Sequence, residues 1–516
     1  VHVRVDHGNG GRRGDGGADG RGVVVRRREA QWKAEDGRRK IEAQTVKGTG
    51  PRPLSAGVAG SFYPEDPKEL ADTVDRLIRG AEVPALPGPV MGVMAPHAGY
   101  AYSGKIAALS WRSLAEHAPW PEAVVILCNS HTLALPSGSV YAPDRFETPL
   151  GSVSIDVELS DRFRKEAGFD YVESSHLREH PLEVHLPFLQ RIFPRVPALL
   201  VSLGPDGQAA ARRAAEALSV ISRDRRILFV ASSDMSHYPP ARVARDVDGS
   251  TLQALESLDQ DRLTQTISRN MQAGHRDLET TLCGEGALRA VLRSGKDRGL
   301  AGVRVLGYTN SGELTGDPGR AVGYGAVVFC GAGPGTAEDP VCLAEGKELV
   351  GLARKSLETL DGPKPRAPQA SGGLHAKKRG AFVTLLSKGR LRGCIGNLEV
   401  QGPLAESVPR LAREAALGDP RFPPVTPKEA RGLEVHVSVL SPLRPAVSTQ
   451  VIPGLHGVVA GWRGRQGVFL PEVADEQGWD RGQLLGHLVG EKAGFPLDAF
   501  EAEGELFTFT TQRFAG

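Results

Sequence analysis

The chain has few cysteines and no long apolar run. Five cysteines occur among 516 residues, an odd number, and no two of them are spaced as Cys-x-x-Cys. This scarcity argues against a disulfide scaffold or a zinc ribbon and favours a reducing environment. No apolar stretch approaches the roughly 18–20 residues that span a bilayer, and the N-terminus lacks the apolar segment of a secretory signal. We therefore expect a cytoplasmic protein without a membrane segment.

The net charge is also small, at +2, and it is unevenly distributed. Residues 1–53 contain 13 Lys and Arg against 7 Asp and Glu, so the remainder of the chain is mildly acidic. The folded domains are therefore not expected to bind nucleic acid. Residues 1–51 are rich in glycine and arginine and poor in apolar residues, which predicts a disordered tail. The tail is interpreted either as an RNA-binding Arg/Gly segment or as an upstream extension outside the native protein.

The first domain is predicted over residues 52–330. Short β-rich apolar runs alternate there with amphipathic helical patterns, which indicates an α/β sandwich around a largely parallel or mixed sheet. Ligand sites of such sheets lie at the carboxyl ends of the strands. The strands are expected at 91–95, 123–128, 198–204, 226–233 and 321–329, and the helices at 68–80, 104–117, 208–221 and 284–295.

A smaller α+β domain is predicted over residues 341–516. It follows a linker at 331–340 whose composition, GAGPGTAEDP, is typical of a loop. Helices are expected at 341–360 and 403–417, a hairpin at 381–400 with its turn at Ser387–Gly389, and a strand at 433–441.

Five short segments of the first domain place a histidine, a cysteine or an acid where an apolar run gives way to small and polar residues. Three of them follow predicted strands of one sheet, so we expect their side chains to converge. The pattern predicts a site for a metal or for polar chemistry at the carboxyl edge of the sheet. The segments are APHAGY with His97, CNSH with His131, EHPLEVHLPF with His180, Glu183 and His185, SSDMSHY with Asp234 and His237, and CGEG with Cys283.

Each of these residues also has a purely structural interpretation. Asp234 is spaced i, i+3 from His237, which fits either a shared site or a helix N-cap. Cys283 begins a predicted helix, whose N-terminus favours a thiolate that acts as nucleophile or metal ligand; a small buried thiol is the alternative. The segment EHPLEVHLPF is interpreted either as an amphipathic packing segment with its polar residues toward solvent, or as part of the site. In the second case its residues support the metal ligands or contact the substrate; they are His180, Glu183 and His185.

Taken in order, these segments resemble the MEMO family (mediator of cell motility), called AmmeMemoRadiSam system protein B in prokaryotes. The resemblance covers about residues 52–330 and extends to AGSFYP (59–64), TPLGSVSID (148–156) and VGYGA. The family is similar to the class III extradiol dioxygenases of the LigB type. The resemblance therefore implies a LigB-like α/β sandwich with a metal pocket.

The resemblance also implies a set of metal ligands. Carried over to this sequence, they are His97, His131 and Cys283, with Asp234 and His237 as additional pocket residues. The dioxygenases have a carboxylate at the position of Cys283. Because a thiolate is a softer ligand than a carboxylate, it shifts the preference toward zinc or copper and away from a hard iron–oxygen site. Iron, zinc and copper are the candidate metals, and dioxygenase activity does not follow from the shared fold.

The second domain resembles the AMMECR family, AmmeMemoRadiSam system protein A. In its LRGCIG motif, Arg392 and Cys394 are candidates for anion binding or nucleophilic chemistry, with a tight glycine turn and a packed thiol as the alternative. The name of the system implies a radical-SAM protein as partner, and the chain itself lacks the Cys-x3-Cys-x2-Cys motif of such an enzyme. The matching segments are LRGCIGNLE (391–399), DPRFPPV (419–425), LEVHVSVLS, GLHGVV (454–459), GVFLPEVA (467–474) and EKAGFP (491–496).

Three functions are compatible with these residues. The first is redox or hydrolytic chemistry on a small molecule or a peptide, with His237 as acid or base and Asp234 orienting it, in association with the radical-SAM protein. The second is a non-catalytic scaffold that binds a peptide or delivers a metal. The third is metal-free hydrolysis by a dyad of Cys283 and a histidine, which requires sulfur and imidazole within hydrogen-bonding distance.

Overall fold

The computed structural model describes residues 51–177, 179–204, 207–333, 339–362, 373–398 and 402–516. Residues 1–50 of the predicted tail and 334–338 of the predicted linker lie outside the described part of the chain. Within that part, every helix is too short or too polar to cross a bilayer.

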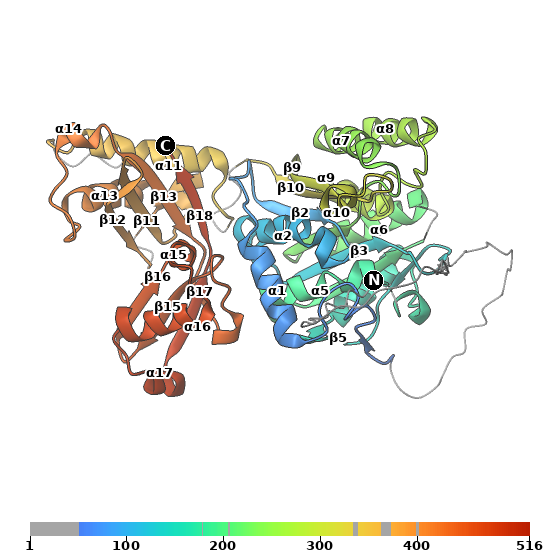
Figure 1. The fold of residues 1–516 in the computed structure, drawn as a ribbon, viewed down its shortest axis with the longest axis horizontal. Helices are drawn as coiled ribbons and strands as arrows, with labels where there is room; N and C mark the ends of the chain where they lie inside the picture. The colour runs from blue at the N-terminus through green and yellow to red at the C-terminus, as the bar shows by residue number, and fades with distance from the viewer. Residues whose placement is uncertain (1–50, 178, 205–206, 334–338, 363–372, 399–401) are drawn as a thin grey trace, which may run out of the picture. The chain divides into compact units, whose positions relative to one another are not determined.

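The first domain is built on a seven-stranded mixed sheet (Figure 1). Its four central strands, β2, β3, β7 and β8, are parallel, whereas β4, β10 and β9 pair in antiparallel fashion with their neighbours. The order across the sheet is β4 (Gly138–Val140), β7 (Ala198–Leu203), β3 (Ala123–Asn129), β8 (Ile227–Ser232), β2 (Val90–Ala95), β10 (Gly323–Gly331) and β9 (Leu300–Asn310).

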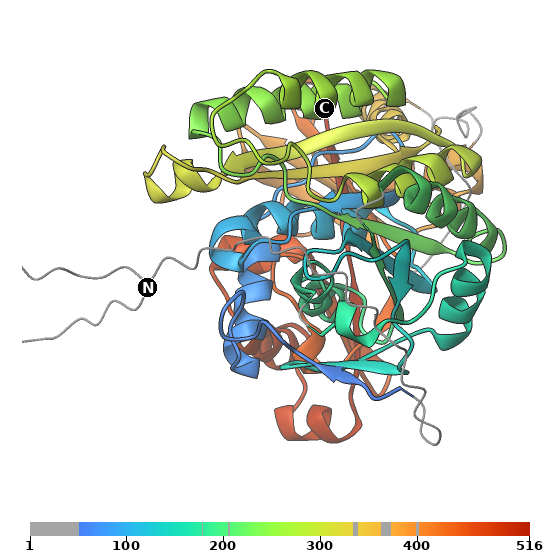
Figure 2. The same cartoon turned by 90° about the vertical axis from the view of Figure 1, so that its right-hand side faces the viewer.

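Helices cover both faces of this sheet (Figure 2). Side chains of β3 alternate between the two cores: Val124 and Ile126 pack with one set of helices, and Val125 and Leu127 with the other. Burial on both faces explains the continuous apolar runs, and the predicted α/β sandwich is confirmed. One face carries α1 (Pro67–Arg79), α2 (Tyr100–His117) and α5 (Leu186–Ile192); the other carries α3 (Val157–Ala167), α6 (Gly207–Ile221), α7 (Ala241–Glu256), α8 (Gln260–Gln272) and α9 (Glu285–Asp297).

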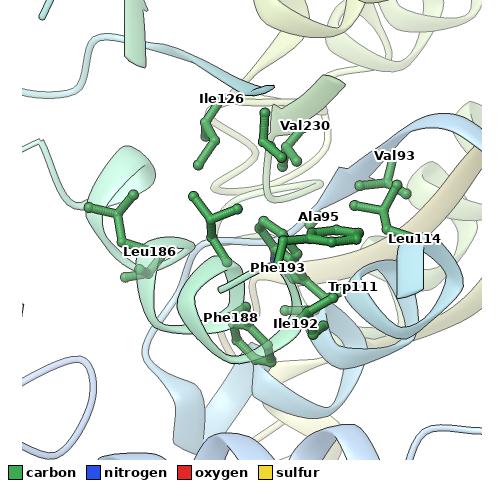
Figure 3. Packing of buried hydrophobic residues seen from close by; sticks show 14 of the residues in the cluster. Val93, Ala95, Trp111, Leu114, Ile126, Leu186, Phe188, Ile192, Phe193 and Val230 are labelled. Atoms are coloured by element: carbon green, nitrogen blue, oxygen red, sulfur yellow. The ribbon is translucent and has the colours of Figure 1, made fainter. Parts of the chain in front are cut away.

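The core on the first face is aromatic where α2 and α5 meet the sheet. Trp111 of α2 and Phe188 of α5 stack with their ring centroids 6.1 Å apart, and both are fully buried (Figure 3). They pack near Val93, Ile126 and Val230 of the central strands. This packing fixes the chain that follows α4 (His180–Glu183) against the strand ends.

The predicted strands and helices of this domain occur within about four residues of their expected ends. Strand β9 was missed because it lies at the edge of the sheet and is half-buried along most of its length, without a continuous apolar run. The pair α7 and α8 was also missed, because both helices are rich in charged and polar residues and bury only a narrow stripe. A small sheet of β1 (Leu54–Ser55), β5 (Arg145–Thr148) and β6 (Gly151–Ser154) completes the domain, with α10 (Ser311–Thr315) after β9.

The second domain has two four-stranded sheets, which confirms the α+β prediction. The first sheet, in the order β12 (Arg390–Asn397), β11 (Ala381–Ser387), β13 (Glu434–Leu440) and β18 (Thr511–Ala515), packs against α11 (Leu343–Glu358) and α13 (Leu404–Leu417). The second sheet, which the sequence did not reveal, has the order β14 (Arg444–Pro445), β17 (Glu505–Phe509), β15 (Gly457–Trp462) and β16 (Arg465–Phe469). Shorter helices lie between β16 and β17 in the chain: α15 (Pro471–Gln477), α16 (Arg481–Gly486) and α17 (Leu497–Glu503).

The hairpin of β11 and β12 turns where the sequence predicts it. Lys388 and Gly389 both have positive φ, at 51° and 73°. A two-residue turn of this kind matches the twist of the flanking strands and favours glycine. The LRGCIG motif lies on β12, which is an edge strand of its sheet.

Candidate metal centre

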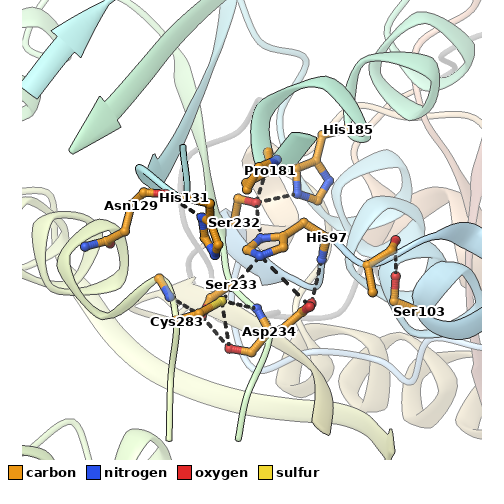
Figure 4. A network of polar contacts seen from close by, with 12 residues as sticks. His97, Ser103, Asn129, His131, Pro181, His185, Ser232, Ser233, Asp234 and Cys283 are labelled. Carbon is orange, nitrogen blue, oxygen red and sulfur yellow. Dashed lines mark hydrogen bonds and ion pairs between the residues drawn. The ribbon is translucent and has the colours of Figure 1, made fainter. Parts of the chain in front are cut away.

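The structure brings together the three residues that were predicted as metal ligands. His97 lies just after β2, His131 just after β3, and Cys283 in the turn before α9 (Figure 4). Nε2 of His97 is 3.3 Å from Sγ of Cys283. One ligand atom from each of the three residues lies within 4.8 Å of the others. The convergence occurs at the carboxyl ends of parallel strands, as expected for a site in such a sheet.

His97 is held on both its backbone and its ring. Its N–H donates to Oδ1 of Asp234 at 2.8 Å, and its Nδ1 is 2.8 Å from the hydroxyl of Ser232. The residue is only 1% exposed. Burial, with the nearby His131 as the next cause, lowers the pKa of His97 well below its usual value. A neutral imidazole with its Nε2 facing Cys283 is the form that binds a metal.

His131 is oriented by its own backbone and by Glu179. Its Nδ1–H donates to the carbonyl of Asn129 at 2.8 Å, so Nε2 is the nitrogen that remains to face a ligand. Burial lowers the pKa of His131, but hydrogen bonds with Cys283 and Glu179 outweigh it and raise the pKa to about 10, so a metal would have to displace the Nε2 proton. The Glu179 carboxylate accepts hydrogen bonds from the backbone N–H of His131 and from the hydroxyls of Ser130 and Thr132. Glu179 was not singled out from the sequence, although it directly precedes His180 in a buried segment. The side chain of His131 is 24% exposed, so the centre is accessible from this side.

The backbone beside Cys283 can pack closely against β8 because the next residue, Gly284, has no side chain. A Cβ at Gly284 would lie 2.3 Å from the carbonyl oxygen of Ser232, so only glycine permits this contact. The N–H of Asp234 donates to Sγ at 3.1 Å. Helix α9 begins at Glu285, two residues after Cys283. Burial raises the pKa of the Cys283 thiol, so the thiolate expected from a helix N-terminus is not favoured without a metal.

Two further histidines border the three ligands. The ring of His180 lies 5.5 Å from that of His97 and 5.4 Å from that of His131, measured between centroids. His237 has a buried Nε2 with no hydrogen-bond partner among the described residues. Burial lowers the pKa of both imidazoles to about 4, so both are neutral near pH 7. Each can exchange a proton or a hydrogen bond with a bound molecule.

The structure places Glu183 and His185 away from the three ligand atoms. The Glu183 carboxylate accepts from the N–H groups of Gly57 and Val58 and from the hydroxyl of Tyr63. It therefore anchors the segment that precedes α1. His185 is fully buried behind Ser232, and its Nε2 lies 3.0 Å from that hydroxyl.

A model of the Memo-like protein family matches residues 54–328, more than half of the chain. This chain belongs to the Memo-like family. A model of the AMMECR1 family matches residues 350–514, so the chain joins a Memo-like domain to an AMMECR1 domain, and the predicted fusion is confirmed. The observed architecture of the Memo-like domain is the α/β sandwich that the LigB-like fold of the family implies.

Relatives of the Memo-like domain occur in archaea and bacteria. A MEMO1 family protein of Methanopyrus kandleri is 34% identical over 289 residues, which cover 53% of this chain and 98% of the relative. A MEMO1 family protein of Aquifex aeolicus is 36% identical over 277 residues, with 53% and 97% covered. Among solved structures, an uncharacterized protein of Pyrococcus horikoshii matches 33% of this chain, a shorter part than the Memo-like domain, with 90% of that protein covered, 33% identity and a TM-score of 0.31.

A neighbouring histidine of the Memo-like domain, His176, belongs to the core and not to the metal centre. Its ring packs against Tyr141 and Tyr171, with centroid distances of 5.5 and 5.8 Å. Nε2 of His176 lies 2.8 Å from the hydroxyl of Ser139. Burial lowers the pKa of His176 to about 4.

The lowered pKa of His176 predicts how the stability of the protein depends on pH. Unfolded histidine titrates near pH 6.5, so between about pH 4 and 6.5 the unfolded state binds more protons than the native state, and stability falls as the pH is lowered. Glutamine at this position keeps an acceptor for Ser139 and does not titrate. Between pH 7 and pH 4, the His176→Gln variant should lose about 3 kcal/mol less unfolding free energy than the unmodified protein. Urea unfolding at both pH values measures this, and an equal loss in both proteins would contradict it.

The candidate residues of the AMMECR1 domain are engaged in structural contacts. Cys394 lies beside Thr384, whose hydroxyl is 3.3 Å from Sγ, and its N–H donates to Asp419. Arg392 forms an ion pair with Glu429. Burial raises the pKa of the Cys394 thiol. These contacts fit the packed-thiol interpretation, and the predicted anion-binding or nucleophilic role stays a prediction.

Proposed function

We propose that the Memo-like domain binds one metal ion through His97 Nε2, His131 Nε2 and Cys283 Sγ. The observation that carries this proposal is the direction of the two imidazoles. Nδ1 of each ring is 2.8 Å from an oxygen atom of the protein, so the Nε2 atoms face one another and the sulfur. Three ligands of this kind with one accessible side are typical of a metal site that keeps a position open.

The ligands favour zinc or copper, with iron as the third candidate. A thiolate and two imidazoles form a softer set than the two histidines and one carboxylate of non-haem iron oxygenases. A bound metal would supply a Lewis acid or, for copper and iron, a redox centre. The backbone N–H of Asp234 on Sγ would stabilise the thiolate once the metal displaces its proton.

The chemistry proposed for this centre is redox or dioxygenase-related, on a small molecule or a peptide, with a radical-SAM protein of the same system as partner. His237 would take or give a substrate proton, because its Nε2 is buried, neutral and unpartnered among the described residues. Asp234 would orient the site through its contact with the backbone of His97. His180, at the exposed side beside His131, would contact the substrate.

A metal-free Cys–His hydrolase is the second candidate, because Sγ of Cys283 and Nε2 of His97 lie 3.3 Å apart. That separation meets the geometric requirement for a nucleophile and its base. Burial raises the pKa of the thiol and lowers that of the His97 imidazole, which opposes a thiolate–imidazolium pair between these two residues. For His131, however, hydrogen bonds with Cys283 and Glu179 outweigh burial and raise the pKa of the imidazole to about 10. The contact with His97 therefore favours shared metal ligation, and His131 is the imidazole that would pair with a thiolate in the hydrolase.

The full chain, purified without oxygen and stripped of metal, should bind one zinc, copper or iron ion. The His131→Ala variant should bind none at the same concentration. Oxygen uptake and hydrolysis, assayed with each metal restored, then separate the functions. Metal binding without turnover would indicate a scaffold or a delivery protein. Turnover in the stripped protein, blocked by iodoacetamide, would replace the metal proposal with the hydrolase.

A further inference from the structure

The hydroxyl of Ser232 lies between two imidazoles at the end of β8. Its Oγ is 2.8 Å from Nδ1 of His97, 3.0 Å from Nε2 of His185 and 2.6 Å from the carbonyl oxygen of Pro181 (Figure 4). Ser232 and His185 are both fully buried. Three polar atoms therefore share one hydroxyl group in the absence of competing solvent.

The donor and acceptor roles in this cluster follow from the groups at its two ends, the carbonyl of Pro181 and the indole of Trp111. A carbonyl oxygen only accepts, so the single proton of the Ser232 hydroxyl goes to Pro181. An indole N–H only donates, and Nε1 of Trp111 lies 3.3 Å from Nδ1 of His185. Nδ1 of His185 is therefore the acceptor, and the ring proton of His185 is on Nε2, from which it donates to Ser232.

The hydroxyl oxygen of Ser232 thus accepts from both rings. Nδ1 of His97 must carry a proton to donate to it, and the lone pair of the neutral His97 ring is left on Nε2. That atom faces Sγ of Cys283 at 3.3 Å. The hydrogen bonds of this buried cluster select the one tautomer of His97 that presents Nε2 as a ligand.

We propose that Ser232, itself held by His185 and Trp111, is a positioning residue that fixes the tautomer and the ring direction of His97. The proposal rests on the metal-binding function proposed above. It assigns His185 a role that differs from ligation or substrate contact: the ring is a fixed donor behind the site. The same short segment, 179–185, also holds His131 through Glu179. This one segment therefore orients both of the proposed imidazole ligands.

Variants of Ser232 and His185 test this arrangement in the full chain. Ser232→Ala removes the acceptor of the His97 ring. His185→Met removes the Nε2–H that donates to Ser232 and replaces the imidazole by an apolar side chain of similar length. His185→Gln should preserve the function, because an amide oxygen accepts from Trp111 and an amide N–H donates to Ser232. Ser294→Ala is the matched control, since among the described residues that buried hydroxyl donates only to the carbonyl of Val291 within its own helix.

Zinc affinity, measured by competition with a chelator, and the absorption spectrum of the cobalt-substituted protein are the readouts. Ser232→Ala and His185→Met should weaken zinc binding by about 10- to 100-fold and change the cobalt ligand-field bands. His185→Gln and Ser294→Ala should stay within about 3-fold of the unmodified protein, with its spectrum. Rescue by glutamine distinguishes hydrogen-bond polarity from mere packing, and thermal unfolding identifies any variant that does not fold.

Two results would overturn the positioning role. One is equal zinc affinity and an unchanged spectrum in a folded Ser232→Ala or His185→Met variant. The other is a His185→Gln variant as weak as His185→Met at equal thermal stability. If His97→Ala binds zinc as tightly as the unmodified protein, the proposed metal centre itself fails, whatever the Ser232 and His185 variants do.

Discussion

Replacing His97 with alanine or Cys283 with serine is expected to lower the zinc affinity of the Memo-like domain by at least about 100-fold. Each change removes one of the three proposed ligand atoms, which lie within 4.8 Å of one another. Serine at position 283 keeps the size of the side chain but replaces a soft sulfur by a hydroxyl that is a weak zinc ligand. Chelator competition with zinc on the full chain measures the loss.

A matched control for this experiment is Cys330→Ser. Cys330 is fully buried in β10 and belongs to the core of the sheet. We expect this variant to lose stability through a buried hydroxyl and to keep its zinc affinity when folded. Equal zinc binding by the His97 and Cys283 variants and the control would show that the three residues are not the ligands.

The largest effect on stability is expected from Glu183→Ala. The carboxylate, on a residue that is 3% exposed, accepts two backbone N–H groups at 2.8 and 3.0 Å and the Tyr63 hydroxyl at 2.6 Å. Alanine would leave the N–H of Val58 and the hydroxyl of Tyr63, both on buried residues, without an acceptor, which costs about 3–5 kcal/mol. Urea unfolding of the full chain measures the loss.

The same variant separates anchoring from metal binding. Asp72→Ala, which removes an exposed partner of Lys68, should change the unfolding free energy by less than about 0.5 kcal/mol and serves as the control. Folded Glu183→Ala protein should still bind zinc, because Glu183 contacts the segment before α1 and none of the three ligands. Normal stability combined with lost zinc binding would contradict this assignment.

The location of the site could be predicted from the sequence because it depends on strand ends. His97 and His131 directly follow apolar runs that are buried on both faces, and parallel strands bring such positions to one edge of the sheet. The part that could not be predicted depends on how the segment 179–185 packs back onto the sheet. The hydrogen bonds from Ser130 to Glu179 and from Ser232 to Pro181 span 49 and 51 residues of sequence. No local pattern encodes contacts of that separation.

Two elements of the fold show the same contrast between local and distant contacts. The hairpin turn at Lys388 and Gly389 was predicted because its chemistry is local. Strand β9 was not, because an edge strand is stabilised by its pairing with β10 and carries no continuous apolar run. Similarly, the sequence places Cys283 near a helix N-terminus, but the rise in its thiol pKa comes from burial by distant segments.

X-ray absorption at the zinc edge, on the full chain loaded with one equivalent of zinc, tests directly whether His97, His131 and Cys283 bind the metal. The proposed metal centre should give a first shell with one sulfur at about 2.3 Å and two imidazole nitrogens at about 2.0–2.1 Å, with the sulfur lost in Cys283→Ser. A first shell without sulfur in the unmodified protein, or one that the Cys283→Ser change leaves intact, would contradict it.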